Sequence, residues 1–407
     1  MSVALRNHPS TGSGTTCRND CYTKCGGFDK LNHRNENLLD CPFLCYTVAM
    51  DKVFLPYLEK IEASLQRALP LESNQQWLSD SFGGLSAALK ESHVSNLIKP
   101  CRLLMDLGGK RWRPLLLVLC SQMARECCEK SPFTLEQTYD VTALVEFVHT
   151  ASLIHDDIED GADTRRGKPA AHITFGLDTS LNAGAWLYFE AGVCIEKLDC
   201  DQDIKNRLYS LYMNELRRLH LGQAMDIYWH RNPQVIPAVE EYTQMVHLKT
   251  GTLASLSAKT GVFCGGANQA QIENAGIIAA GIGEGFQILD DVQNLTTGNP
   301  GKKRGDDIVE GKKSLPVLLH LKENPEDQEK ISSCFIRAAN EGIESPAVEE
   351  CIAILESKGA IQKALQKGKI CIEKNCTDLA NLFEKSCQTA TLIEKLFKDM
   401  IPGGKND

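Results

Sequence analysis

The stretch that says most about the fold is ALVEFVHTASLIHDDIED, residues 143–160. Its apolar residues recur at three- and four-residue steps, which predicts a buried helix. Asp156 and Asp160 lie four residues apart on one helical face, with Asp157 beside them. A run of charges is usually the solvated end of a helix, but this run follows the apolar segment directly. We therefore expect it at the mouth of a buried groove, where gathered carboxylates favour a hard cation such as Mg²⁺.

Most of the chain repeats this helical pattern. Apolar residues keep the helical period from about Val53, whereas the alternating pattern of strands is nearly absent. The same period runs through Leu115–Met123, Val141–Ile158, Leu208–Leu221, Ala275–Val292 and Ile352–Leu365. The sequence therefore predicts an all-α fold, with one domain at residues 50–407 in which long helices surround a central cavity.

A second acidic cluster, FQILDDVQN at residues 286–294, ends another apolar helix. Gln287 lies one turn before Asp290 and shares its face. Asn294 occupies the position that matches Asp160, and it would be a weaker, neutral ligand. One aspartate pair alone is poor evidence for a site. Two such clusters, facing each other across a helical bundle, would hold a diphosphate through bridging Mg²⁺ ions.

The basic counterpart is GGKRWRP, residues 108–114, a glycine turn that opens a helix. A helix N-terminus attracts anions, and Lys110 and Arg113 would together grip one diphosphate. His149 lies two turns before Asp156 and would reach the same anion, although a lone histidine is more often a core or surface residue. Further cations are expected beside the clusters, Arg165 and Arg166 at the first and Lys249, Lys302 and Lys312 at the second. Each alone is usually solvated, but their occurrence beside acidic motifs favours phosphate binding.

Composition excludes some classes of function. The 53 acidic and 44 basic residues give a net charge of −9, which argues against nucleic acid as a partner. No apolar run is long enough for a transmembrane helix. The 17 cysteines occur in a chain too long for a small disulfide scaffold, so they indicate buried free thiols in a reducing compartment.

The first 49 residues differ from the rest because they lack a sustained period. Their five cysteines have spacings that zinc sites rarely show. Residues 1–19 are basic and rich in Ser and Thr, which weakly resembles a transit peptide. Met50 is equally suitable as a functional start, which would make the segment a dispensable extension. The default location is therefore the cytoplasm, with a plastid or mitochondrion as the alternative.

These motifs together resemble the trans-isoprenyl diphosphate (polyprenyl) synthases. The resemblance runs from about residue 97 to about residue 325, with weaker similarity to about residue 385. It rests on the motifs above and on Arg165-Arg166-Gly167, Gly222-Gln223-x-x-Asp226, Lys249-Thr250-Gly251 and Gly311-Lys312, which follow the family's order. The resemblance implies an isoprenoid synthase bundle, a homodimer, and Mg²⁺-dependent condensation of isopentenyl diphosphate with dimethylallyl, geranyl or farnesyl diphosphate.

The resemblance also implies a role for each matching residue. Isopentenyl diphosphate would bind to Lys110, Arg113, His149 and Arg166. Magnesium would bind to Asp156, Asp157, Asp160 and Asp290. The allylic diphosphate would bind to Arg165, Lys249 and Lys302, with Gln287 and Lys312 assisting and Thr250 beside Lys249. The allylic group would ionise, the double bond of isopentenyl diphosphate would attack the cation, and a proton would then be lost.

Two rival functions share some of these features. A class I terpene cyclase needs no second diphosphate site, and a non-catalytic regulatory subunit would be expected to lose an aspartate motif. Asn294 and Asp226–Trp229 match geranylgeranyl synthases of animals and fungi, whereas His155 is closer to bacterial sequences. The small residues Ala151 and Ser152 should line the path of the growing chain. We therefore expect geranylgeranyl diphosphate as the product, with a longer polyprenyl diphosphate as the alternative.

Overall fold

The computed structural model describes residues 51–298, 303–383, 385 and 387–401. These residues form helices almost throughout, which confirms the predicted all-α fold. The helices of the first half are η2 (Lys52–Phe54), α2 (Leu55–Ala68), α3 (Gln75–Phe82), α4 (Glu91–Asp106), α5 (Trp112–Cys127), α6 (Leu135–Asp140), α7 (Ala143–Glu159), α8 (Ala171–Phe175), α9 (Leu177–Glu190) and α10 (Val193–Glu196).

The second half of the chain continues in the same way. Its helices are α11 (Gln202–His230), α12 (Val239–Val246), the π-helical turn η3 (His247–Gly251), α13 (Thr252–Gly265), α14 (Gln269–Thr296), α15 (Asp306–Val309), α16 (Leu315–Glu323), η4 (Pro325–Asp327), α17 (Gln328–Glu341), α18 (Pro346–Ser357), α19 (Ala360–Ala380) and α20 (Gln388–Lys398). Within the described residues the only strands, β1 (Thr164–Arg165) and β2 (Lys168–Pro169), form a short antiparallel hairpin after α7.

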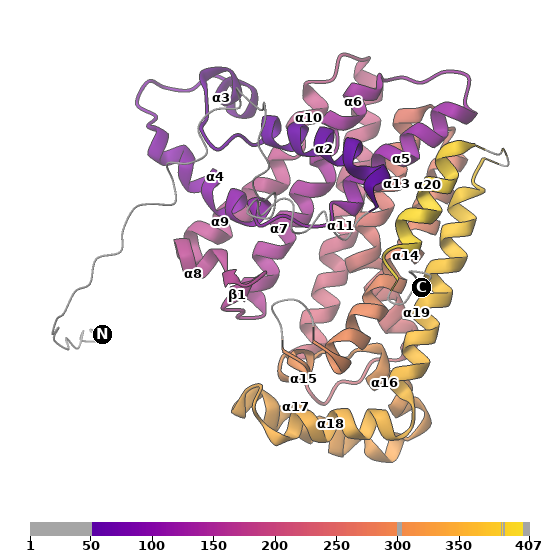
Figure 1. Cartoon of the computed structure of the whole chain (residues 1–407). Coiled ribbons are helices and arrows are strands. Elements are labelled where there is room, and N and C mark those ends of the chain that lie inside the picture. The colour runs from indigo at the N-terminus through magenta and orange to yellow at the C-terminus, as the bar shows by residue number, and fades with distance from the viewer. Residues whose placement is uncertain (1–50, 299–302, 384, 386, 402–407) are drawn as a thin grey trace, which may run out of the picture. The chain divides into compact units, whose positions relative to one another are not determined.

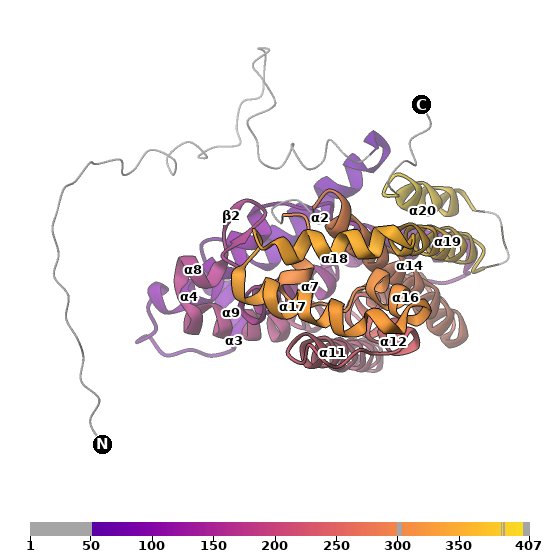
Figure 2. The same ribbon diagram turned by 90° about the horizontal axis from the view of Figure 1, so that it is seen from below.

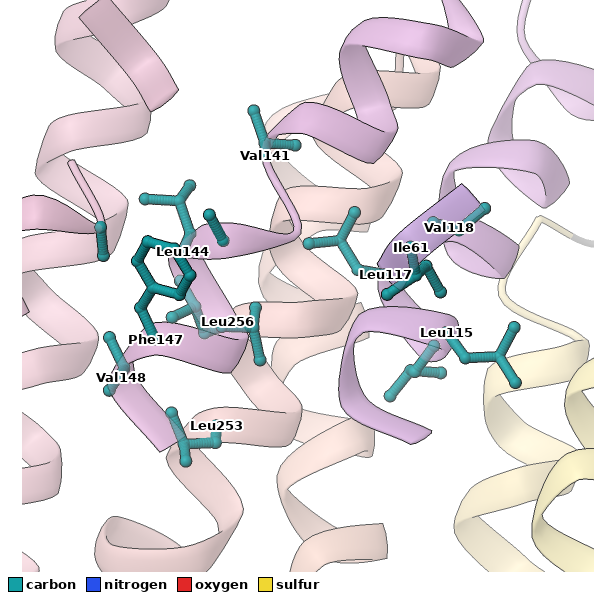
Figure 3. Packing of buried hydrophobic residues seen from close by; sticks show 14 of the residues in the cluster. Ile61, Leu115, Leu117, Val118, Val141, Leu144, Phe147, Val148, Leu253 and Leu256 are labelled. Carbon is teal, nitrogen blue, oxygen red and sulfur yellow. The ribbon is translucent and has the colours of Figure 1, made fainter. Parts of the chain in front are cut away.

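The long helices form one bundle with α13 at its centre (Figure 1). Every residue of α13 is buried, which is the pattern of a helix covered on all sides. It packs between α5 and α14, and α14 packs in turn against α19. Figure 3 shows Leu253 and Leu256 of α13 beside Phe147 of α7, all within one continuous core. This core fixes α7 and α14, the two helices that carry the acidic clusters.

A second, smaller core closes one end of the bundle. Helices α15 to α18 lie at that end (Figure 1), and the view from below shows α16, α17 and α18 across it (Figure 2). The β1–β2 hairpin lies at the same end, where α7 finishes (Figure 1). The acidic ends of α7 and α14 therefore open toward a part of the fold built from short helices and loops.

One predicted helix is wrong. The period over Ile352–Leu365 suggested a single helix, but α18 ends at Ser357 and α19 begins at Ala360. Gly359 between them has φ +71°, in the left-handed region that glycine adopts without strain. Gly359 follows the last turn of α18 and ends that helix. The apolar residues of α19 happen to continue the spacing of those in α18, so the sequence pattern hides the break.

Several predictions concern residues outside this description. The irregular extension at residues 1–49 and its cysteines lie there, and so does Lys302. The boundary at residue 50 and the cellular location therefore stay predictions. Among the described helices, each is too short or too polar to cross a lipid bilayer.

Candidate active site

A cavity of about 630 Å³ opens between the ends of α7, α11 and α14. It brings together residues from distant parts of the chain, in agreement with most of the sequence predictions. The predicted residues that line it are Lys110, Arg113, His149, Asp156, Asp160, Arg165, Arg166, Lys249, Thr250, Gln287, Asp290 and Lys312. The described residue of that set that does not line it is Asp157.

Asp156 and Asp160 both face the cavity, as their helical spacing predicted. Asp156 Oδ1 accepts a hydrogen bond of 2.7 Å from Gln223 Nε2 and lies 3.6 Å from Lys249 Nζ. Asp160 Oδ2 lies 3.2 Å from Lys312 Nζ. We expected both lysines beside the second cluster, and their ion pairs with the first cluster correct that expectation. The correction arises because η3 and the loop after α15 approach the end of α7.

Asp226 on α11 is a part of the site whose role the sequence did not reveal. Its carboxylate is buried, and Lys249 Nζ lies 2.6 Å from Asp226 Oδ2. Burial alone would raise the pKa of Asp226, but the ammonium groups of Lys249 and Lys312 together lower it. Burial would likewise lower the pKa of Lys249, but Asp156 and Asp226 raise it. Both groups therefore stay charged. The signal in the sequence was Gly222-Gln223-x-x-Asp226, whose members share a helical face.

Asp157 is turned away from the cavity. Its side chain is 1% exposed and accepts hydrogen bonds from Nε and Nη2 of Arg165, which lies on β1. Burial raises the pKa of Asp157, and the Arg165 guanidinium opposes that rise. In this arrangement Asp157 fixes a cation that lines the cavity, and its own role as a metal ligand stays a prediction.

The second cluster differs, because both of its aspartates border the cavity. Asp291 is nevertheless buried in the cavity wall, with 5% of its surface exposed. Tyr242 donates a hydrogen bond of 2.6 Å to Asp291 Oδ2, and the Leu315 amide donates one of 3.1 Å. Gln287 Nε2 donates to Asp291 Oδ1 at 3.0 Å. Burial raises the pKa of Asp291 to about 6, against the lowering effect of these donors.

Asn294 does not border the cavity, although its spacing matches that of Asp160. Its side chain is fully buried and lies outside the lining of the cavity. Asn294 Oδ1 accepts a hydrogen bond of 3.3 Å from the Asp307 amide, and its carbonyl accepts one of 2.9 Å from the Gly305 amide. Asn294 therefore fastens the segment around α15 to the end of α14.

The basic loop before α5 forms another wall of the cavity. Arg113 Nη1 lies 3.5 Å from His149 Nε2, and burial lowers the pKa of Arg113 to about 10. Burial, together with Arg113 and Arg166, holds the pKa of His149 well below its usual range. His149 is therefore neutral at pH 7. Arg166 donates hydrogen bonds to the carbonyls of Gly108 and Leu104, which attaches the hairpin to the loop.

Comparison with known proteins agrees with this geometry. The Polyprenyl synthetase family matches residues 94–355, which include every described site residue named above. The chain belongs to the polyprenyl synthetase family. It is therefore an enzyme that transfers prenyl groups, and the cavity is the candidate for its active site.

Three members of the family illustrate the likeness. Geranylgeranyl pyrophosphate synthase of Neocamarosporium betae is 35% identical over 257 residues, or 62% of this chain and 68% of that protein. Heptaprenyl diphosphate synthase from Staphylococcus aureus has a TM-score of 0.67 at 25% identity, covering 86% of this chain and 98% of that one. Polyprenyl synthase from Caulobacter crescentus CB15, solved with calcium and isoprenyl diphosphate, has a TM-score of 0.67 at 20% identity, covering 87% and 97%.

The carboxylates of this polyprenyl synthetase fit a hard divalent cation that is shared with a substrate. Asp156, Asp160 and Asp290 supply oxygen donors to one cavity. Within the part of the chain that the structure describes, no three His, Cys, Asp or Glu side chains converge closely enough to hold a metal alone. Cations that keep water and complete their coordination with phosphate oxygens need only one or two protein carboxylates.

Proposed function

We propose that this polyprenyl synthetase condenses isopentenyl diphosphate with an allylic diphosphate in the presence of Mg²⁺ and makes geranylgeranyl diphosphate. The observation that supports this is the presence of two different cationic groups around one cavity. Lys110, Arg113 and Arg166 surround the neutral His149, whereas Lys249 and Lys312 alternate with the aspartates of the first cluster. A reaction between two diphosphate substrates needs two cationic sites, one for each diphosphate group. One of these sites would also bind metal.

The aspartate side of the cavity suits the allylic diphosphate. Its C–O bond breaks, the electron pair leaves with the diphosphate, and Lys249, Lys312 and Arg165 stabilise that growing negative charge. Mg²⁺ at Asp156, Asp160 and Asp290 would supply Lewis-acid charge at the same place.

The loop side suits isopentenyl diphosphate, whose double bond then attacks the allylic cation and forms the new C–C bond. The released diphosphate would take the proton that this step sets free. His149 is neutral, so it can both accept a hydrogen bond from Arg113 and donate one to a phosphate oxygen. Lys110 and Arg113 supply the compensating charge.

A layer of rings supports a product of limited length. Tyr188 on α9 packs against His155 at 5.5 Å and against His220 on α11 at 5.1 Å between ring centroids, and all three line the cavity. Ser152 lines it as expected, but Ala151 is fully buried in the core and does not. The rings therefore provide the floor that the small residues of α7 do not.

The decisive assay combines the enzyme, isopentenyl diphosphate, farnesyl diphosphate and Mg²⁺, with the product length read by chromatography. A 20-carbon product supports the proposal. A cyclic hydrocarbon formed without isopentenyl diphosphate would instead indicate a cyclase, and absence of any product would contradict the proposal.

Two variants test the floor. Tyr188→Ala should shift the product toward longer chains, because it removes the central ring of the layer. Ser152→Phe should shorten the product, at a stability cost of about 1–3 kcal/mol if the site is tightly packed. An unchanged product from a folded, active Tyr188→Ala enzyme would show that this layer does not limit growth.

We also propose that the enzyme is a homodimer that pairs through α9 and α11. Leu177, Leu181 and Phe189 project from one side of α9 at four-residue multiples, and Phe189 is 75% exposed. On α11 the exposed apolar residues are Met213, Leu221 and Tyr228. Light scattering after size-exclusion chromatography should give about twice the chain mass. Phe189→Glu should yield a monomer, and a monomeric wild-type enzyme would exclude the pairing.

A further inference from the structure

Arg111, in the middle of the basic loop, points into the protein and not into the cavity. Its side chain is 5% exposed and its backbone has φ +48°, a left-handed conformation. Arg111 Nε donates to Glu62 Oε1 on α2 at 2.5 Å, and Nη1 donates to Glu146 Oε1 on α7 at 2.7 Å. Nη2 donates to the Met105 carbonyl at 2.7 Å. The guanidinium thus fixes the turn from which Lys110 and Arg113 project.

Trp112, the next residue, is held from the opposite end of the chain. Its ring lies 5.8 Å from Phe397 on α20 and 5.6 Å from Phe286, which immediately precedes Gln287 of the second cluster. Phe286 and Phe397 are themselves 5.9 Å apart, so the three rings form one cluster. The Arg113 guanidinium lies over the Trp112 ring at 4.5 Å. A shift of α20 would therefore displace the Trp112 ring and, with it, the Arg113 guanidinium that lines the cavity.

These two supports come from segments outside residues 94–355, the range that matches the family. Helix α2 precedes that range and α20 follows it. The two segments are also joined to each other, because Lys395 Nζ on α20 lies 2.7 Å from Asp51 Oδ2, just before η2. Segments near both ends of the described chain therefore contact the basic loop, residues 108–114, from two sides.

We infer that Glu62 and Phe397 are positioning residues for the subsite that binds isopentenyl diphosphate. They act through Arg111 and Trp112 and touch no substrate. This inference rests on the proposed function, which assigns Lys110 and Arg113 to that substrate. Loosening either support lets the loop move, so that the two cations meet the diphosphate less often in the right geometry, while the aspartate side keeps its own ion pairs with Lys249 and Lys312.

The test compares how each variant changes KM for isopentenyl diphosphate and KM for farnesyl diphosphate. Glu62→Ala and Phe397→Leu should each raise KM for isopentenyl diphosphate about tenfold, because misplacement of a binding group on this scale is costly. kcat and KM for farnesyl diphosphate should stay within about twofold of wild type. The conservative variants Glu62→Gln and Phe397→Tyr keep the acceptor and the ring, and they should restore most of the affinity.

Matched controls exclude a general effect of destabilisation. Glu136→Gln breaks an exposed ion pair with Lys60 on α2, and Phe133→Leu removes a ring that packs on Phe263 away from the loop. Neither control should change KM for isopentenyl diphosphate, even where its melting temperature falls as far as that of the test variants.

Two results would overturn the inference. One is an unchanged KM for isopentenyl diphosphate in folded Glu62→Ala and Phe397→Leu enzymes. The other is an equal rise in both Michaelis constants that the controls reproduce at similar melting temperatures. Failure of the proposed function is a different outcome, because then the wild-type enzyme itself would not consume isopentenyl diphosphate.

Discussion

The two acidic clusters differ more in structure than in sequence. In each, the first aspartate faces the cavity and the second is buried, but Asp157 is turned away from the cavity and Asp291 borders it. Asp157 is matched by the cation Arg165, whereas Asp291 is held by the uncharged Tyr242 hydroxyl and a backbone amide. The third positions diverge, since Asp160 faces Lys312 in the cavity and Asn294 is buried.

This difference shows that a repeated motif does not imply a repeated set of ligands. In the first cluster the aspartates that border the cavity are Asp156 and Asp160, and in the second they are Asp290 and Asp291. Asp291 and Asn294 also connect α14 to α12, α15 and the start of α16. We therefore expect substitutions at the first positions and at Asp160 to affect turnover most, and those at Asp291 and Asn294 to affect stability.

The largest effects are expected at the first positions. Asp156→Asn and Asp290→Asn should each lower kcat by about a thousandfold or more, because under the proposed function each carboxylate would hold the cation beside the leaving diphosphate. Melting temperatures should change little. Single-turnover assays with saturating Mg²⁺ provide the measurement. Near-normal turnover of the Asp290 variant would show that the second cluster is not part of the catalytic site.

Substitutions at the third positions, Asp160 and Asn294, should have different effects in the two clusters. Asp160→Asn should lower kcat by about a hundredfold, because it removes a cavity-facing anion. Asn294→Asp, which restores a third aspartate, should leave kcat within about threefold of wild type and lower the free energy of unfolding by about 1–2 kcal/mol. Urea unfolding and steady-state assays on both variants check this. A marked gain in activity for Asn294→Asp would mean that this position does reach the metal.

Asp291 should give the smallest effect on turnover, and its effect on stability depends on pH. The pKa of Asp291 is about 6 in the folded protein and 3.8 in a free side chain. Between these values the folded state holds a proton that the unfolded state has lost, so stability falls as pH rises through this window. The change is on the order of 3 kcal/mol.

The variant Asp291→Asn should abolish this part of the decline. The measurement is urea unfolding from pH 4 to pH 7 with a chelator present. If the wild-type and variant curves run parallel across that range, Asp291 does not titrate with the raised pKa.

Much of the outer shell of the site could be predicted from the sequence, because it depends on helical spacing. Asp156 and Asp160 share a face at four residues, and Gln287 shares one with Asp290, so their common exposure to the cavity follows from local geometry. The helices that carry these pairs could be predicted from the period of the apolar residues alone.

The inner shell could not be predicted, because its partners are distant in sequence. Tyr242 is 49 residues from Asp291, and the Leu315 amide is 24 residues away in the other direction. Nothing in the local pattern shows that α12 and the start of α16 meet at that carboxylate. The same reason applies to Arg111, whose partners Glu62 and Glu146 are 49 and 35 residues away in sequence.

The π-helical turn η3 has a consequence for how the cavity accommodates a growing chain. A Cβ at Gly222 of α11 would lie 2.4 Å from the Lys249 nitrogen, and one at Gly283 of α14 would lie 2.8 Å from the Gly251 Cα. Backbone therefore touches backbone on both sides of η3, which leaves this wall of the cavity little room to shift. Under the proposed function, space for each added isoprene unit would then have to come from side chains such as those of the Tyr188 layer.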